Sequence, residues 1–243
     1  MLKIIYTYLI STIILPIIFL VPTLLCKLVG YKLHSWEILT NILVKYLFNA
    51  EYLIFGEKLI DNGIILANHM SMIDGGIDNV INESQGVYRY AYLISMLING
   101  LITYIEDWGI CIIRGKTTRN QLILQIKDKL EYVNRILLYP EGTRKSYYNK
   151  GIIDKTLIKE NLKYGTIVSI YEELPTTKVQ IVISLNKDKV FTNIGRTKVP
   201  IIRSKYIIPN HYKNINDFLD KVIESYIECH NELYSENIYA KWH

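Results

Sequence analysis

The most informative part of the sequence is the segment IILANHMSMID, residues 64–74, in which an apolar run gives way to a polar turn. The run Ile64–Ala67 predicts a buried strand, and the residues after it predict a turn and then a helix that starts around Ser71. His69 is then expected at the carboxyl edge of a sheet, with Asp74 about one turn into the helix. In that arrangement the carboxylate can accept a hydrogen bond from one ring nitrogen and leave the other free as a base.

Other short β-branched runs predict that this strand belongs to a larger sheet. They are Tyr52–Phe55, Ile110–Ile113, Ile136–Tyr139, Ile167–Tyr171 and Val179–Ser184. Apolar stripes with helical spacing occupy residues 122–133 and 215–233, and Asn214 or Asn216 could cap the second of these helices. Strands separated by helices indicate an α/β domain with a mixed, largely parallel sheet flanked by helices.

In open parallel sheets, ligands bind where strands end and loops begin, so the residues after the other runs are also informative. Ile136–Tyr139 is followed by the turn PEGTRK, residues 140–145, which carries an adjacent Arg and Lys. The run Gly109–Ile113 leads directly to Arg114. Arginines on such loops are suited to hold a phosphate through paired hydrogen bonds. The sequence therefore predicts a site for an anionic substrate beside a His–Asp base.

The composition restricts the class of protein. Half of the 243 residues are apolar and about a fifth are charged, which excludes a disordered chain and a disulfide miniprotein. The three cysteines are far apart and encode neither a disulfide framework nor a zinc site, so we expect no metal. A net charge of +5 is too small to indicate a nucleic-acid binder, but it suits anionic lipid surfaces or phosphate-bearing substrates.

The amino-terminal segment predicts membrane attachment. Residues 4–26 carry no charge and lie between Lys3 and Lys27. A helix over this run would be about 34 Å long at 1.5 Å per residue, enough to cross a hydrocarbon core of about 30 Å. A cleaved secretory signal is disfavoured, because the run is long for one and no small-residue cleavage site follows it before Lys27.

Pro16 and Pro22 lie within this run and tend to kink or end a helix. A hairpin that enters one leaflet therefore fits about as well as a helix that spans the bilayer. We expect residues 1–50 to form a hydrophobic anchor and a second helix, and residues 51–243 to form the catalytic domain. The expected location is a membrane, with the active site on the cytosolic side.

The loops resemble the sequence blocks of a known family. Asn68-His69-x-Ser71-x-x-Asp74 matches the NHxSxxD block of the glycerolipid acyltransferases typified by 1-acyl-sn-glycerol-3-phosphate acyltransferase, and residues 141–144 are identical to the EGTR block. The stretch from Gly109 to Arg114 matches the block between them, although at the commonest spacing its glycine would fall on Trp108. A fourth block, an apolar segment ending in Val-Pro, is not recognisable, and its expected place at residues 165–170 has no proline. The resemblance covers about residues 35–235, and an amino-terminal anchor is also typical of the family.

The resemblance implies a glycerol-3-phosphate acyltransferase-like fold and an acyltransferase of phospholipid biosynthesis. His69, held by Asp74, would remove the proton from the free hydroxyl of lysophosphatidic acid, whose oxygen would attack the thioester of an acyl-CoA to make phosphatidic acid. Acyl-CoA is then a co-substrate, and no cofactor is implied. The residues implied to hold the acceptor's phosphate are Arg114, Glu141, Thr143 and Arg144, with Gly142 allowing close approach and Asn68 and Ser71 supporting the site.

Two alternatives remain open. The acceptor could be another lysophospholipid, such as lysocardiolipin or lysophosphatidylinositol, or the chain could be a relative that binds lipids without catalysis. A serine hydrolase is disfavoured because the sequence contains no GxSxG motif. The expected partners are acyl-CoA, a lysophospholipid and a membrane, without nucleic acid, and the sequence indicates no particular protein partner.

Overall fold

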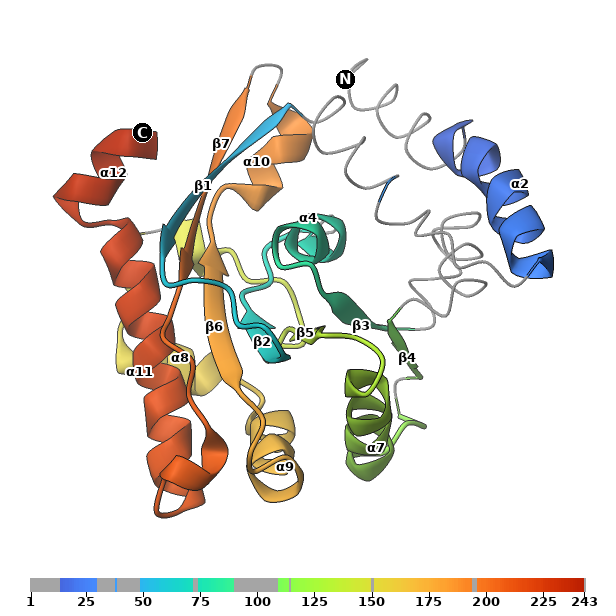
Figure 1. Cartoon of the computed structure of the whole chain (residues 1–243). Coiled ribbons are helices and arrows are strands. Elements are labelled where there is room, and N and C mark those ends of the chain that lie inside the picture. The colour runs from blue at the N-terminus through green and yellow to red at the C-terminus, as the bar shows by residue number, and fades with distance from the viewer. Residues whose placement is uncertain are drawn as a thin grey trace.

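The computed structural model describes residues 14–29, 38, 49–71, 74–89, 109–113, 115–149, 151–193 and 196–242. Within these ranges the chain forms a seven-stranded sheet with helices on both faces (Figure 1). The strands are β1 (Ala50–Gly56), β2 (Gly63–Ala67), β3 (Gln85–Arg89), β4 (Ile110–Ile112), β5 (Arg135–Leu138), β6 (Val179–Ser184) and β7 (Thr197–Arg203). Their order across the sheet is β1-β7-β6-β2-β5-β3-β4.

Most of the sheet is parallel. Strands β6, β2, β5, β3 and β4 run in one direction, whereas β7 pairs antiparallel with β6 and parallel with β1. The carboxyl ends of β2, β4, β5 and β6 therefore share one edge, and β1 and β7 end at the opposite edge. The prediction of a largely parallel α/β sheet is confirmed.

Two helical layers cover the sheet because its central strands are apolar on both faces, as is usual for parallel sheets. Along β2, Ile64 and Leu66 belong to one core cluster, and Ile65 and Ala67 belong to the other. The first cluster packs against α7 (Arg119–Leu130), α8 (Lys155–Asn161), α9 (Tyr164–Glu173) and α11 (Ile215–Leu233). The second packs against α4 (Asp74–Ile81) and α10 (Lys187–Thr192). The remaining elements are α2 (Leu15–Leu28), η3 (Tyr147–Asn149), η4 (Pro209–His211) and α12 (Glu236–Trp242).

One predicted strand is wrong. Residues 167–171 lie within helix α9, where Ile167 and Ile170 face the core at helical spacing. A short apolar run has no periodicity of its own that separates a buried strand from a buried helix. The stretch at residues 165–170, the expected place of the fourth family block, belongs to the same helix. The other five runs are confirmed as strands.

Strands β3 and β7 were not predicted. Strand β3 begins with Gln85 and Gly86, which do not belong to an apolar run, and Lys198 and Pro200 interrupt the apolar pattern of β7. A proline within a run normally argues against an interior strand. Here β7 lies between β1 and β6, and the carbonyl of Pro200 accepts a hydrogen bond from Leu185.

The segment predicted to be an amino-terminal anchor is described only in part. Helix α2 covers residues 15–28 of the apolar region, with Pro22 inside it, and the rest of residues 1–50 lies largely outside the described ranges. Ile18, Val21 and Leu25 are exposed on this helix. Among the described residues, no helix combines the length and the apolar character that crossing a membrane requires. The predicted spanning helix is therefore not shown.

The first turn of α11 provides a test of its cap. The side-chain oxygen of Asn214 accepts hydrogen bonds from the backbone N–H groups of Asn216 and Asp217, at 2.9 and 3.0 Å. Replacing Asn214 with Ala leaves these groups without their partner and should lower the free energy of unfolding by about 1 kcal/mol in a urea titration. The exposed Asn216, one position inside the helix, is the control, and its change to Ala should cost almost nothing. Equal losses would contradict the assignment of the cap.

Candidate active site

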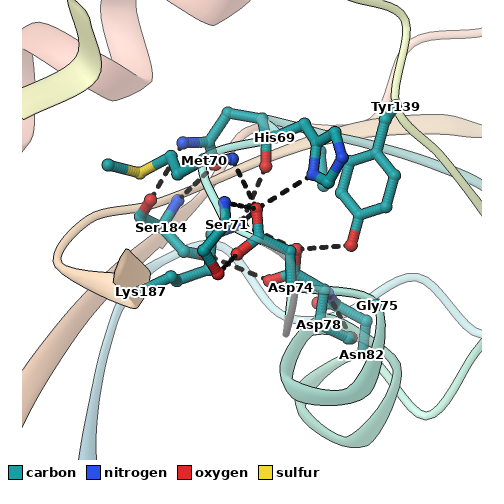
Figure 2. Close-up of polar contacts among 12 residues, drawn as sticks. His69, Met70, Ser71, Asp74, Gly75, Asp78, Asn82, Tyr139, Ser184 and Lys187 are labelled. Carbon is teal, nitrogen blue, oxygen red and sulfur yellow. Dashed lines mark hydrogen bonds and ion pairs between the residues drawn. The ribbon is translucent and has the colours of Figure 1, made fainter. Parts of the chain in front are cut away.

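The core of the site lies where β2 meets α4. Nδ1 of His69 is 3.1 Å from Oδ2 of Asp74, the contact that the sequence spacing predicts (Figure 2). Asp74 is fully buried, whereas 23% of the His69 side chain is exposed. A reacting group can thus reach the imidazole from outside while the carboxylate behind it stays dry.

The Asp74 carboxylate accepts several hydrogen bonds besides that from His69. The backbone N–H of Ser71 donates to Oδ2 at 2.9 Å, the Ser71 hydroxyl donates to Oδ1 at 2.6 Å, and the backbone N–H of Met70 also donates to Oδ2. Burial raises the pKa of Asp74, but the nearby Lys187 ammonium and these hydrogen bonds outweigh it and lower the pKa below its usual range. An ionised acceptor at Nδ1 assigns the proton to Nδ1 and leaves Nε2 of His69 free to accept a proton.

Asn68 and Ser71 hold the loop around His69 in place. The Asn68 side chain bonds the backbone of Ser184 twice, donating to its carbonyl at 2.9 Å and accepting from its N–H at 2.8 Å. These bonds tie the end of β2 to the end of β6. Because the Ser71 hydroxyl donates to Asp74, this serine belongs to the support of the loop.

Sequence reasoning missed a buried cation under this loop. Nζ of Lys187 donates to the backbone carbonyl of Asn68 and to Oδ2 of Asp78, both at 2.7 Å, and lies 3.5 Å from Oδ2 of Asp74 (Figure 2). All three charged side chains are fully buried. Two features of the sequence could have indicated this cation and its partner. Lys187 follows strand β6 as His69 follows β2, and Asp78 lies four residues after Asp74, on the same face of α4.

Tyr139 was also missed as a site residue. Its ring stacks on the His69 imidazole, with centroids 4.5 Å apart and planes 22° apart. Its hydroxyl donates to Asp78 at 2.8 Å, which fixes the position of the ring (Figure 2). The imidazole is therefore held by Asp74 at Nδ1 and by Tyr139 against its face.

The EGTR loop is joined to the His69 loop by a backbone hydrogen bond, since the N–H of Lys145 donates to the carbonyl of His69 at 2.7 Å. Thr143 and Arg144 are exposed on this loop. Gly142 has a φ of +65°, and a Cβ there would lie 2.7 Å from Nζ of Lys163. The positive φ favours glycine here, whereas the Lys163 side chain is flexible and could move away from a Cβ.

Glu141 is buried, unlike the other charged and polar side chains of the EGTR loop. Its side chain is 1% exposed, and Oε1 accepts a hydrogen bond from the Tyr148 hydroxyl. Oε2 has no hydrogen-bond partner among the described residues. Burial raises the pKa of Glu141 to about 7, although the bond from Tyr148 lowers it. The predicted direct contact between Glu141 and a phosphate does not fit this interior position. The hydrogen bond from Tyr148 instead joins the EGTR loop to η3.

Arg114 lies outside the described residues, but the space beside its strand is described. A cavity of about 410 Å³ lies at the end of β4, and the apolar side chains of Ile112 and Leu122 are among the residues that line it. Arg119 and Lys163 line it as well, and neither forms a salt bridge within the described ranges. Lys163 also contacts the EGTR loop at Gly142, so the cavity adjoins that loop. In the same ranges, no cluster of His, Cys, Asp and Glu could hold a metal ion.

The whole chain is similar to a solved structure, that of the 1-acyl-sn-glycerophosphate (LPA) acyltransferase PlsC from Thermotoga maritima, with a TM-score of 0.65. The two chains are 16% identical, and the match covers 97% of each. No protein-family model matches the chain, and no curated protein matches it significantly. At this level of identity the similarity establishes a common fold, and it is the fold that the sequence resemblance implies.

The buried carboxyl of Glu141 predicts a pH dependence of stability. Its pKa is raised from 4.5 to about 7, so between these pH values the folded protein holds a proton that the unfolded chain has released. Stability therefore falls as the pH rises through this window. Glu141→Gln removes this loss and should stabilise the protein relative to wild type by up to a few kcal/mol at pH 8, since a tenfold change in proton affinity corresponds to about 1.4 kcal/mol.

Thermal unfolding at pH 5 and pH 8 measures this difference. The exposed Glu172 is the control, and Glu172→Gln should follow the wild-type pH dependence. If the advantage of Glu141→Gln were the same at both pH values, the raised pKa would be contradicted.

Proposed function

We propose that this protein is an acyltransferase of lipid biosynthesis that moves a fatty acyl group from acyl-CoA to the free hydroxyl of lysophosphatidic acid. The observation that carries the proposal is the contact between His69 and Asp74 at the end of β2, beside the EGTR loop. The shared fold with the Thermotoga maritima LPA acyltransferase supports it, because the match extends over 97% of both chains.

The chemistry needs a base and two aligned substrates. Nε2 of His69 takes the hydroxyl proton as the acceptor oxygen attacks the thioester carbonyl. The tetrahedral intermediate collapses, the C–S bond breaks, and the proton on His69 passes to the leaving sulfur of coenzyme A. Asp74 keeps the ring in the required tautomer and stabilises the imidazolium that forms between these steps. A thioester is already activated, so alignment supplies much of the remaining rate enhancement.

The exposed part of the EGTR loop is the proposed site for the acceptor's phosphate. Thr143 and Arg144 are available there, and Gly142 lets the loop backbone approach a ligand closely. Arg114 at the end of β4 would add a second guanidinium. Glu141 supports the loop from inside and makes no contact with the phosphate in this proposal. Arg119 and Lys163 in the adjoining cavity add positive charge on the same side.

We further propose that residues 1–50 attach the protein to a membrane, with the active site on the cytosolic side. The uncharged run and the exposed apolar residues of α2 support this arrangement. Both substrates are amphiphiles, so attachment would raise their concentration near His69.

His69→Ala should lower kcat about 10²- to 10⁴-fold, because general bases typically contribute that much. The measurement is acyl transfer by the purified protein from labelled acyl-CoA to a panel of lysophospholipids that includes lysophosphatidic acid, lysocardiolipin and lysophosphatidylinositol. His211, an exposed histidine in η4, is the control, and His211→Ala should retain full activity. Near wild-type turnover by His69→Ala would contradict the assignment of the base, and the panel identifies the acceptor.

Arg144→Ala should raise KM for lysophosphatidic acid at least tenfold, because a hydrogen bond to a charged group is worth about 1.5–3 kcal/mol. The KM for a monoacylglycerol acceptor, which has no phosphate, should change little. Lys205→Ala is the control, since this exposed lysine follows β7 at the opposite edge of the sheet. An equal change for both acceptors would show that Arg144 does not read the phosphate.

A further inference from the structure

A fully buried lysine is costly unless carboxylates and hydrogen-bond acceptors compensate its charge. The Lys187 ammonium has three such neighbours, namely the carbonyl of Asn68 and the carboxylates of Asp78 and Asp74. Burial lowers the pKa of Lys187, but the two carboxylates outweigh it and raise the pKa, so the lysine is charged. Its position directly under the loop of His69 raises the question of what this charge does for the base.

Asp74 and Asp78 are separated by one turn of α4, and both face the same ammonium. Two buried carboxylates near each other cannot both stay ionised without a cation, because one of them takes up a proton. Burial raises the pKa of Asp78, and the Lys187 ammonium lowers the pKa of both carboxyls. Without Lys187 the pair would share a proton, and to the extent that this proton bound Asp74, the carboxylate would lose part of its capacity to accept the hydrogen bonds from His69, Ser71 and Met70. The orientation of the imidazole thus depends on the charge of Asp74, and that charge depends on a neighbouring cation.

We propose that Lys187 is a positioning residue of the active site, whose ammonium balances Asp74 and Asp78 and keeps Asp74 ionised and bound to His69. The role of His69 as a base in this proposal rests on the proposed acyl transfer. Lys187 does not touch the substrate in this arrangement and acts through the carboxylate. It also holds the Asn68 carbonyl, so the same group fixes the backbone immediately before His69.

Other titratable groups surround this centre and enter its charge balance. On the side of the EGTR loop, the Tyr139 ring lies 5.9 Å from Nζ of Lys187, and Glu141 interacts with the lysine electrostatically. On the side of Asp78, electrostatic interactions involve Tyr52 of β1 and Tyr226 of α11. The tyrosines stay neutral because burial raises the pKa of Tyr52 and Tyr226. Asp74 and Lys187 keep their charges near neutral pH, whereas Glu141, whose pKa is about 7, changes its charge there, so Glu141→Gln is the background in which the pH profiles are compared.

A cycle of three variants tests the charge balance. Asp78→Asn removes one negative charge, Lys187→Met removes the positive charge, and the double variant removes both and restores the wild-type sum. The pH at which kcat/KM falls on the acid side reports the protonation of His69. This pH should fall by about one unit in Asp78→Asn, where a negative charge near His69 is lost, and return to the wild-type value in the double variant. In Lys187→Met it should also fall, because the proton taken up by the Asp74–Asp78 pair weakens the carboxylate that faces Nδ1 of His69.

At pH 7, Lys187→Met should also lower kcat at least tenfold while KM changes less than threefold, and Asp78→Asn should recover part of that loss in the double variant. Lys189→Met, which changes an exposed lysine of the same helix, is the matched control and should leave the profile unchanged. If Lys187 were only structural, all variants would lose activity in proportion to unfolding, without a shift in the pH profile. That result would overturn the proposal. Should Lys187→Met not fold, the lowered pH in Asp78→Asn and its return to the wild-type value in the double variant still decide the matter.

A second measurement does not need acyl transfer. NMR titration of 13C-labelled histidine rings follows the protonation of His69, whose signal is identified by its loss in His69→Ala. The His69 pKa should fall in Asp78→Asn and in Lys187→Met and return to the wild-type value in the double variant. If these shifts occur but the protein transfers no acyl group, the proposed function is refuted and the positioning role of Lys187 is retained. If the protein transfers acyl groups but the His69 pKa is unshifted in all three variants, the positioning role is refuted and the proposed function is retained.

Discussion

The ionised carboxylate of Asp74 is the feature on which the rest of the site depends. It occupies the first position of α4, where a negative charge is favoured by the helix dipole, and it accepts hydrogen bonds from the loop that precedes the helix. The same oxygen that orients His69 also organises the backbone at Met70 and Ser71. Loop conformation, imidazole tautomer and local charge are therefore different consequences of one buried anion.

The sheet supplies the geometry that this anion needs. Because β2, β5 and β6 are parallel, their carboxyl ends deliver the His69 loop, the EGTR loop and Lys187 to one edge. Short hydrogen bonds then join neighbouring loops, from Asn68 to Ser184 and from Lys145 to His69. Strands β1 and β7 run the other way, so their loops lie at the far edge and leave this one to the site.

Charges are divided between the two sides of these loops. Negative groups lie inside, where Asp74 and Asp78 face Lys187 and Glu141 is held by Tyr148. Cationic and hydroxyl groups such as Arg144 and Thr143 lie outside. This separation would suit the proposed anionic substrate, because its phosphate would meet positive charge at the surface while a buried carboxylate holds His69 from beneath.

Much of this arrangement follows from local sequence. The apolar run before Asn68 determined where β2 ends. The five-residue spacing from His69 to Asp74 determined the contact between the imidazole and the carboxylate, and the glycine of the EGTR loop determined a tight turn at the end of β5. Tertiary structure alone decided the rest. Residues 167–171 became helix because α9 packs Ile167 and Ile170 on the sheet, β7 accommodated Pro200 between two strands, and Glu141 turned into the core. Lys187 contacts Asp74 although the two residues lie over a hundred positions apart in the chain. The sequence could not reveal this contact, because it depends on the order of the strands across the sheet, and that order leaves no periodic pattern in the chain.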